Sequence, residues 1–230
     1  MKELERAQQQ YRQRDSDPSI RSFWSLSNPV ALHLLQERER AVLRAMSEAG
    51  MALENARVLD VGCGSAQEFP GYMRWGVQAS QLFGVDLSLH RVQAATARGI
   101  GTVVHASGNA LPFANASFDG AIQNVVFSSI MDSGVRQQVA REMCRVLRPG
   151  GWILWYDAIC VKSSDPHFRG VPLQEVESLF PDITWYWQRV TTHVGLLKRI
   201  HAFMGEGAMR AFDLTGLFKT HRLGLGRMVA

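Results

Sequence analysis

A short apolar run that leads directly into a glycine-rich turn is the feature that most restricts how this chain can fold. Residues 58–61 read VLDV, and Gly62-Cys63-Gly64 follows at once. This order predicts the first βα unit of a doubly wound sheet, because glycine lets the backbone turn sharply and approach a ligand closely. Dinucleotide-binding folds also use such glycines, so the kind of ligand has to be inferred from the flanking residues.

The pattern after residue 57 predicts an α/β fold. Short apolar runs alternate with helical stretches, which is typical of βαβ units and a parallel sheet. We expect strands over residues 57–61, 82–85, 102–105, 119–125, 152–156, 183–190 and 223–229. The expected fold class is therefore α/β: a Rossmann-like, doubly wound, mostly parallel sheet of about seven strands. Its last strand should be antiparallel, and helices should cover it at the N-terminal end.

Helix signals lie on both sides of the first strands. Asn28-Pro29 is a favourable helix start, and apolar residues at helical spacing continue from there towards Gly50, which predicts a helix over 29–49. A second helix is expected over 134–147, where Arg148-Pro149-Gly150-Gly151 should end it and turn the chain into the next strand. A short helix is expected near 173–180.

Length and composition fit one folded domain with a substrate-covering insertion. The chain has 230 residues, of which 46% are apolar, so it can bury a sizeable core. We expect a helical cover over 1–54 and a Rossmann-like methyl-transfer core over 55–230, with a helical lid inserted at about 193–221.

Cysteine usage and hydropathy indicate a cytoplasmic protein. Cys63, Cys144 and Cys160 lie far apart without metal-ligand spacing, so neither a disulfide framework nor a metal site is expected. The first residues carry charges instead of an apolar stretch, and no run approaches eighteen apolar residues. We therefore expect neither a secretory leader nor an integral membrane segment.

Basic residues crowd the C-terminal region. A solvated basic face is one interpretation of this cluster, and attraction of phosphates or peripheral contact with an anionic membrane is the other. The six residues are Lys198, Arg199, Arg210, Lys219, Arg222 and Arg227.

Residues flanking the glycine turn favour an adenosine-containing ligand over a nicotinamide dinucleotide. A nicotinamide fingerprint would have a third glycine at Gln67, and it does not require Asp60. Gly84-Val85-Asp86 closes the second strand with a carboxylate to which both hydroxyls of a ribose can donate.

Four motifs in order resemble the class I S-adenosylmethionine-dependent methyltransferases, particularly their quinone-biosynthesis-like small-molecule branch. The motifs are VLDVGCG, GVDLS, GNALPFANASFDGAIQNVVF and VLRPGG, and they cover about residues 55–157. The resemblance implies that Asp60, Gly62 and Gly64 surround the methionine end of S-adenosylmethionine and that Asp86 holds its ribose. It places the adenine beside Leu87, Asn109 and Ala110.

The chain departs from the family pattern at two positions. Ala66 stands in place of the third glycine, and Asn109 stands where an aspartate is usual. Asn109 can still accept from the adenine amino group through its carbonyl oxygen. The alternative for Asp60 is a purely structural role as a cap. The complete expected cofactor set is Arg14, Asp60, Gly62, Cys63, Gly64, Asp86, Leu87, Asn109, Ala110, Gln123 and Asn124.

Candidates for the methyl-transfer chemistry follow from sheet geometry. In a doubly wound sheet the reacting centre lies beyond the carboxyl ends of the strands, which indicates residues 123–129 and Tyr156-Asp157. Related small-molecule enzymes often carry histidines where Ser128 and Ser129 stand, so a base, if the reaction uses one, must come from elsewhere. Asp157, Tyr156 and His33 are the catalytic candidates, and each also has a structural interpretation as a cap, core or surface residue.

Two functions remain open from the sequence. The first is transfer of a methyl group to a small organic acceptor in a specialised biosynthetic pathway. The second is a non-catalytic regulatory or scaffold subunit that binds S-adenosylmethionine. The Asn124-Val125-Val126-Phe127 segment lacks the prolines of amino-group methyltransferases that act on nucleic acids, so no nucleic-acid partner is expected. The oligomeric state is left open.

Overall fold

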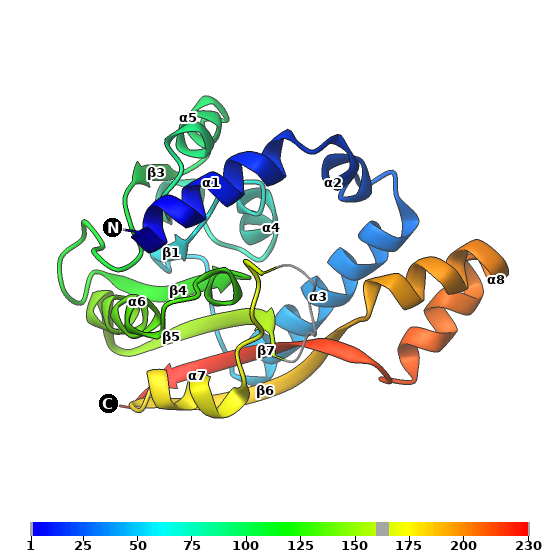
Figure 1. Cartoon of the computed structure of the whole chain (residues 1–230). Helices are drawn as coiled ribbons and strands as arrows, with labels where there is room; N and C mark the ends of the chain where they lie inside the picture. Colours follow the sequence, from blue (N-terminus) through cyan, green and yellow to red (C-terminus); the bar gives the residue numbers. More distant parts are fainter. Residues whose placement is uncertain (1, 160–165, 230) are drawn as a thin grey trace.

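In a computed structural model, which describes residues 2–159 and 166–229, the chain forms a seven-stranded sheet with helices on both faces (Figure 1). The strand order is β3-β2-β1-β4-β5-β7-β6. Strands β1 to β5 pair in parallel, and β7 runs antiparallel to both β5 and β6. This confirms the expected α/β fold and its antiparallel last strand. The strands are β1 (Val58–Val61), β2 (Leu82–Asp86), β3 (Thr102–His105), β4 (Phe118–Asn124), β5 (Leu147–Ala158), β6 (Ile183–Thr192) and β7 (Lys219–Met228).

Two of the long helices begin at residues whose side chains cap them. Asn28 accepts from the Val30 N–H at the start of α3, and Asp132 accepts from the Val135 N–H at the start of α6. The helix expected over 29–49 is confirmed. The helices are α1 (Lys2–Ser16), α2 (Pro18–Phe23), α3 (Pro29–Glu48), α4 (Phe69–Arg74), α5 (Leu89–Ala97), α6 (Ser133–Val146), α7 (Leu173–Leu179) and α8 (Val194–Leu214), with 3-10 turns η1 (Ala79–Gln81) and η2 (Phe127–Ser129).

Two cores lie on opposite faces of the sheet. On one face, Val58 and Ile122 pack with Met46 of α3 and Tyr72 of α4. On the other, the core includes Leu59 and Val61 with side chains of α6 and α7. Because β1 is buried on both faces, its sequence is nearly continuously apolar instead of alternating.

The start of β5 differs from the sequence prediction. The segment Arg148-Pro149-Gly150-Gly151 was expected to be a turn before the strand, but β5 already begins at Leu147, which pairs with Phe118 of β4. The register then shifts, and Gly150 has φ 73°, a left-handed conformation that suits glycine. The glycines therefore form an irregularity within the strand.

The insertion between the last two strands is shorter than the segment expected over 193–221. Strand β7 begins at Lys219, which pairs with Thr192, so residues 219–221 belong to the sheet. Helix α8 occupies 194–214 and bends at Gly205, whose φ of 79° and ψ of −178° are not helical. Figure 1 shows α8 projecting from the sheet beside the start of α3. Its role as a lid stays a prediction.

The described residues contain no helix long and apolar enough to cross a membrane. They also contain no group of three or more metal-ligating side chains. Cys63 and Cys144 are free thiols, and Cys160 lies outside the described residues. The basic residues of the C-terminal region do not all face solvent, because Lys219 is buried and forms ion pairs with Glu37 and Asp213.

Candidate cofactor-binding site

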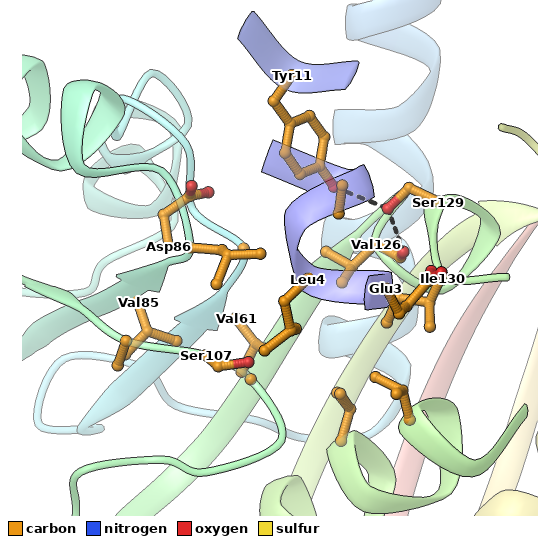
Figure 2. Close-up of a pocket in the computed structure, with 17 residues that line it drawn as sticks. Glu3, Leu4, Tyr11, Val61, Val85, Asp86, Ser107, Val126, Ser129 and Ile130 are labelled. Atoms are coloured by element: carbon orange, nitrogen blue, oxygen red, sulfur yellow. Dashed lines mark hydrogen bonds between the residues drawn. The ribbon is translucent and has the colours of Figure 1, made fainter. Parts of the chain in front are cut away.

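The strand order reverses between β1 and β4, and a pocket opens at the carboxyl ends of these strands. Ligands of open α/β sheets bind at such a switch point. The pocket spans about 550 Å³ when the space that opens to solvent is included. Its walls come from β1, β2, the loops after β2, β3 and β4, and α6, and α1 forms its roof (Figure 2). Apolar side chains dominate these walls, which suits a flat adenine ring.

The turn after β1 adopts a backbone conformation that glycine tolerates better than other residues. Gly62 has φ 77°, and a Cβ atom there would lie 2.5 Å from a methyl carbon of Val126. Gly64 has φ 56°, and a Cβ atom there would lie 3.9 Å from a guanidinium nitrogen of Arg91, which is an ordinary contact distance. Ala66, in place of the third glycine, also adopts a positive φ of 55° and is fully buried. The turn is thus held in a left-handed conformation at three positions.

Asp86 faces the pocket from the end of β2 (Figure 2). One carboxylate oxygen accepts from the Gly64 N–H and the other from the Ser88 N–H, each at 2.8 Å. An ionised carboxylate offers about four acceptor positions, so two remain for donors from a ligand. Cys63 lies in the same turn, where burial raises the pKa of its thiol, so it is not a reactive thiolate.

Asp60 is buried beneath the glycine turn. One of its oxygens accepts from the Tyr72 hydroxyl at 3.0 Å, and Tyr72 in turn accepts from the Asn124 amide at 2.8 Å. The other oxygen, Oδ1, is buried without a hydrogen-bond partner among the described residues. Burial raises the pKa of this carboxyl to about 7. An unsatisfied buried oxygen of this kind fits an ammonium group as its missing partner.

The loop after β4 is strained where it passes the pocket. Val125 has φ 57°, which is rare for a β-branched residue. Its N–H donates to the Tyr156 carbonyl at 2.8 Å, and the Gln123 side chain accepts from the Val126 N–H at 3.1 Å. Gln123 thus supports the loop from within the core. Such strain often marks a functional site.

Helix α1 forms the roof of the pocket. Leu4, Ala7 and Tyr11 recur at helical spacing and line it, and Tyr11 points down to Ser129 (Figure 2). The Tyr11 hydroxyl lies 2.7 Å from the Ser129 Oγ, and Glu3 accepts from the Met131 N–H at 2.8 Å.

On the opposite side of the pocket, α1 is tied to α5 and to the end of β2. Asp15 forms an ion pair with Arg91, and Gln8 donates to the Leu87 carbonyl. The Arg91 guanidinium also lies over the Tyr11 ring, 4.4 Å from its centroid. Helix α1 is therefore attached to both walls of the pocket.

Three of the expected cofactor residues line this pocket, namely Gly62, Asp86 and Leu87. The rest of the glycine turn adjoins the pocket, and so do the hydrogen-bonded residues Asp60, Tyr72 and Asn124. Asn109 lies on the rim, where its carbonyl oxygen accepts from Ser107 and its amide donates to Gln138. Ala110 beside it is exposed. Arg14 lies in the last turn of α1, beyond the residues that reach the pocket.

The three catalytic candidates occupy different places, and none lines the pocket. Asp157 is buried and accepts from the Ser128 and Ala158 N–H groups, and burial raises its pKa to about 6. Tyr156 bonds Thr191 at 2.7 Å and stacks on His221, and burial raises its pKa to about 12.

His33 lies away from the other two candidates. Its Nε2 atom is 3.0 Å from an Asp213 oxygen, which makes an ion pair when the imidazole is protonated. Asp213 belongs to α8, so this contact joins α3 to the inserted helix.

Sequence reasoning expected a helical cover over residues 1–54, but it did not name the residues by which α1 lines the pocket. Leu4, Ala7, Tyr11 and Ser129 were not among the expected site residues, although the spacing of the first three already indicated one helical face. The spacing of side chains on a polar helix does not say which partner the helix covers. That information exists only once α1 is placed over the sheet.

Comparison with known proteins shows similarity to methyltransferases. Residues 59–155 match a family described as a methyltransferase domain. An O-methyltransferase of Aspergillus nomiae is 30% identical over 154 residues, which are 60% of this chain and 63% of the relative. This chain thus spans under two thirds of that relative's length.

Solved structures share the fold at low identity. A [4+2]-cyclase, SpnF, superposes with a TM-score of 0.61 at 18% identity, covering 85% of this chain and 82% of that one. The geranyl diphosphate C-methyltransferase of Streptomyces coelicolor, solved with S-adenosyl-L-homocysteine, gives 0.59 at 14% identity, covering 83% and 77%. The motif order, the sheet topology and the matched domain over residues 59–155 are those of class I S-adenosylmethionine-dependent methyltransferases.

Proposed function

We propose that this protein transfers the methyl group of S-adenosylmethionine to an oxygen of a small organic acceptor in a specialised biosynthetic pathway. The observation that carries the proposal is the pocket at the switch point, where Asp86 and the orphaned oxygen of Asp60 flank one left-handed glycine turn. Oxygen is proposed as the acceptor atom because the relative from Aspergillus nomiae is named an O-methyltransferase.

The pocket residues fit the cofactor part by part. Asp86 would accept from the ribose hydroxyls, while Leu4, Val61 and Leu87 would enclose the adenine. Asp60, with one unpaired oxygen, would accept from the methionine ammonium across the glycine turn. The bound cofactor supplies a methyl group on a sulfonium, which is already a good leaving group.

The protein then has to orient the acceptor and exclude water. We assign Tyr156 to the acceptor side, because it neighbours Asn124 at the carboxyl end of β4 and lies beneath the Arg38 guanidinium, 5.2 Å from its ring centroid. We assign Asp157 a positioning role, because its oxygens hold the loop that carries Ser129. His33 would anchor α8 through Asp213.

Ligand-dependent thermal unfolding of the purified protein tests the cofactor. S-adenosylhomocysteine at a hundred times its Kd should add about 2.7 kcal/mol of stability. NADH at the same concentration should add nothing measurable. Stabilisation by NADH alone would contradict the assigned cofactor.

Transfer of label tests the reaction. Protein incubated with methyl-labelled S-adenosylmethionine and a fractionated cell extract should move label into a small-molecule fraction. Label in nucleic acid or protein would overturn the acceptor class. Cofactor binding without any label beyond a boiled control would instead support the second candidate, a non-catalytic regulatory or scaffold subunit. That candidate is favoured by the absence of Asp157, Tyr156 and His33 from the pocket walls.

A further inference from the structure

Two arginines face each other across the last two strands of the sheet. Arg189 of β6 pairs directly with Arg222 of β7, and Asp157 of β5 continues the same row. Side chains directly opposite in an antiparallel ladder share a face, with Cβ atoms about 4.5–5.5 Å apart, and like charges there are destabilising. The fold therefore places two like-charged side chains next to each other on one face of the sheet.

No described residue neutralises this pair. Neither arginine takes part in an ion pair within residues 2–159 and 166–229. The neighbouring Asp157 bonds the Ser128 and Ala158 N–H groups and forms no ion pair with either arginine within the described residues. The Arg222 Nε atom is buried without an acceptor from the described part of the chain. Burial and the charge of Arg189 lower the pKa of Arg222, which means that its charged form lacks a counterion.

Further unpaired donors lie on the same face of the sheet. Trp187 precedes Arg189 by two residues on β6, and Trp155 precedes Asp157 by two on β5, so the alternation of a strand places them on this face. The indole Nε1 of each is buried and finds no acceptor among the described residues. Native proteins leave few buried donors unsatisfied, so this face of the sheet carries a surplus of donors.

We propose that Arg189 and Arg222 form a binding site for a phosphate group, free or carried by a small molecule. A phosphate monoester carries about −1.5 to −2 charges at pH 7, which balances two guanidinium groups, whereas a monocarboxylate balances one. Its oxygens also accept paired N–H bonds from the planar guanidinium fork. None of the residues of this site lines the cofactor pocket. Phosphate binding is therefore measured without cofactor and stands apart from methyl transfer.

Thermal unfolding and calorimetric titration of the full chain test the site. Inorganic phosphate should raise Tm by roughly 5–10 °C at a hundred times its Kd. Sodium chloride and sodium acetate at matched ionic strength should raise it far less. Tighter binding of glycerol 3-phosphate would identify a phosphorylated small molecule as the ligand, and tighter binding of inorganic phosphate would identify the free ion. A phosphate response no larger than that of chloride overturns the proposal.

Three charge-matched variants locate the response. Arg189→Gln leaves an exposed position and should fold, and Arg222→Gln removes the partly buried partner. Both should raise Tm in phosphate-free buffer, because the repulsion is gone, and both should abolish the phosphate response. Arg199→Gln, at an exposed position on α8, should change neither. The site would be disproved if Arg189→Gln and Arg199→Gln lost the phosphate response equally. It would also be disproved if Arg189→Gln had a lower Tm than the wild type in phosphate-free buffer.

Discussion

Asp86 connects the two walls of the cofactor pocket through one carboxylate. It holds the glycine turn through Gly64 and the start of α5 through Ser88, and it faces the pocket at the same time. Asp86→Asn keeps the shape of the side chain but loses its charge. Each charged hydrogen bond is worth about 1.5–3 kcal/mol, so the affinity for S-adenosylhomocysteine should fall by roughly ten- to hundredfold. Calorimetric titration measures the fall, and Asp182→Asn at an exposed position serves as the control.

Asp60 should make the stability of the protein depend on pH. Its pKa is raised from 3.8 to about 7 in the folded state, so the folded protein keeps a proton that the unfolded chain has released. The stability contributed by this group is therefore lost as pH rises from about 4 to about 7.

The matched variant Asp60→Asn isolates this effect from His221, whose lowered pKa acts in the opposite direction over part of the same range. The stability of Asp60→Asn relative to wild type should increase with pH up to about 7, as urea unfolding at several pH values would show. The affinity of the wild type for S-adenosylhomocysteine should increase over pH 6–8, because the ionised carboxylate binds the ammonium. A pH-independent difference in stability would show that the carboxyl ionises normally.

At the scale of elements, α1 is a roof attached on two sides. Tyr11→Phe removes one attachment, the bond to Ser129, while keeping the ring under Arg91. The free energy of unfolding should fall by about 1 kcal/mol, and S-adenosylhomocysteine should dissociate faster. A double-mutant cycle with Ser129→Ala should give a coupling of about 0.5–1.5 kcal/mol. Additive effects would mean that the two hydroxyls do not interact.

Helix α6 is fixed to the loop after β4 by a buried guanidinium. Arg136 is fully buried, donates to the Ile130 carbonyl and forms an ion pair with Glu175 of α7. Arg136→Ala should lower the free energy of unfolding by about 3–5 kcal/mol, because the Ile130 carbonyl and the Glu175 carboxylate both lose the cation that binds them. Arg169 bonds the same Glu175 from a half-exposed position, so Arg169→Ala should cost at most about 1 kcal/mol. Urea unfolding of both variants measures the contrast.

For the whole molecule, a buried ionic cluster joins the inserted helix to the sheet and to α3. Lys219 of β7 bonds Glu37 of α3 at 2.8 Å and Asp213 of α8 at 2.7 Å, and all three side chains are largely buried. Glu37 also accepts from the N–H of Thr191, which adopts a strained φ of 62° and holds Tyr156. The attachment of α8 and the position of Tyr156 are therefore linked.

Lys219→Met should destabilise the protein by about 3–5 kcal/mol and loosen α8, because two buried carboxylates lose their cation. Hydrogen exchange should show the loss of protection first in α8 and β6. Arg210→Met removes an exposed ion pair of the same helix and should change stability by under about 1 kcal/mol. Similar losses in the two variants would contradict a special role for the buried cluster.

The sequence alone determined the order of strands along the chain and the glycine turn, because both depend on local patterns. Burial on both faces makes β1 apolar throughout, and a left-handed turn selects Gly62 and Gly64, so each leaves a signature within a few residues. The carboxylate of Asp86 was predictable for the same reason, since it closes the next strand. Only the tertiary structure decided which residues of α1 line the pocket, that His33 meets Asp213 and that Arg189 faces Arg222. These contacts join residues far apart in sequence, and the register and packing that create them leave no local trace.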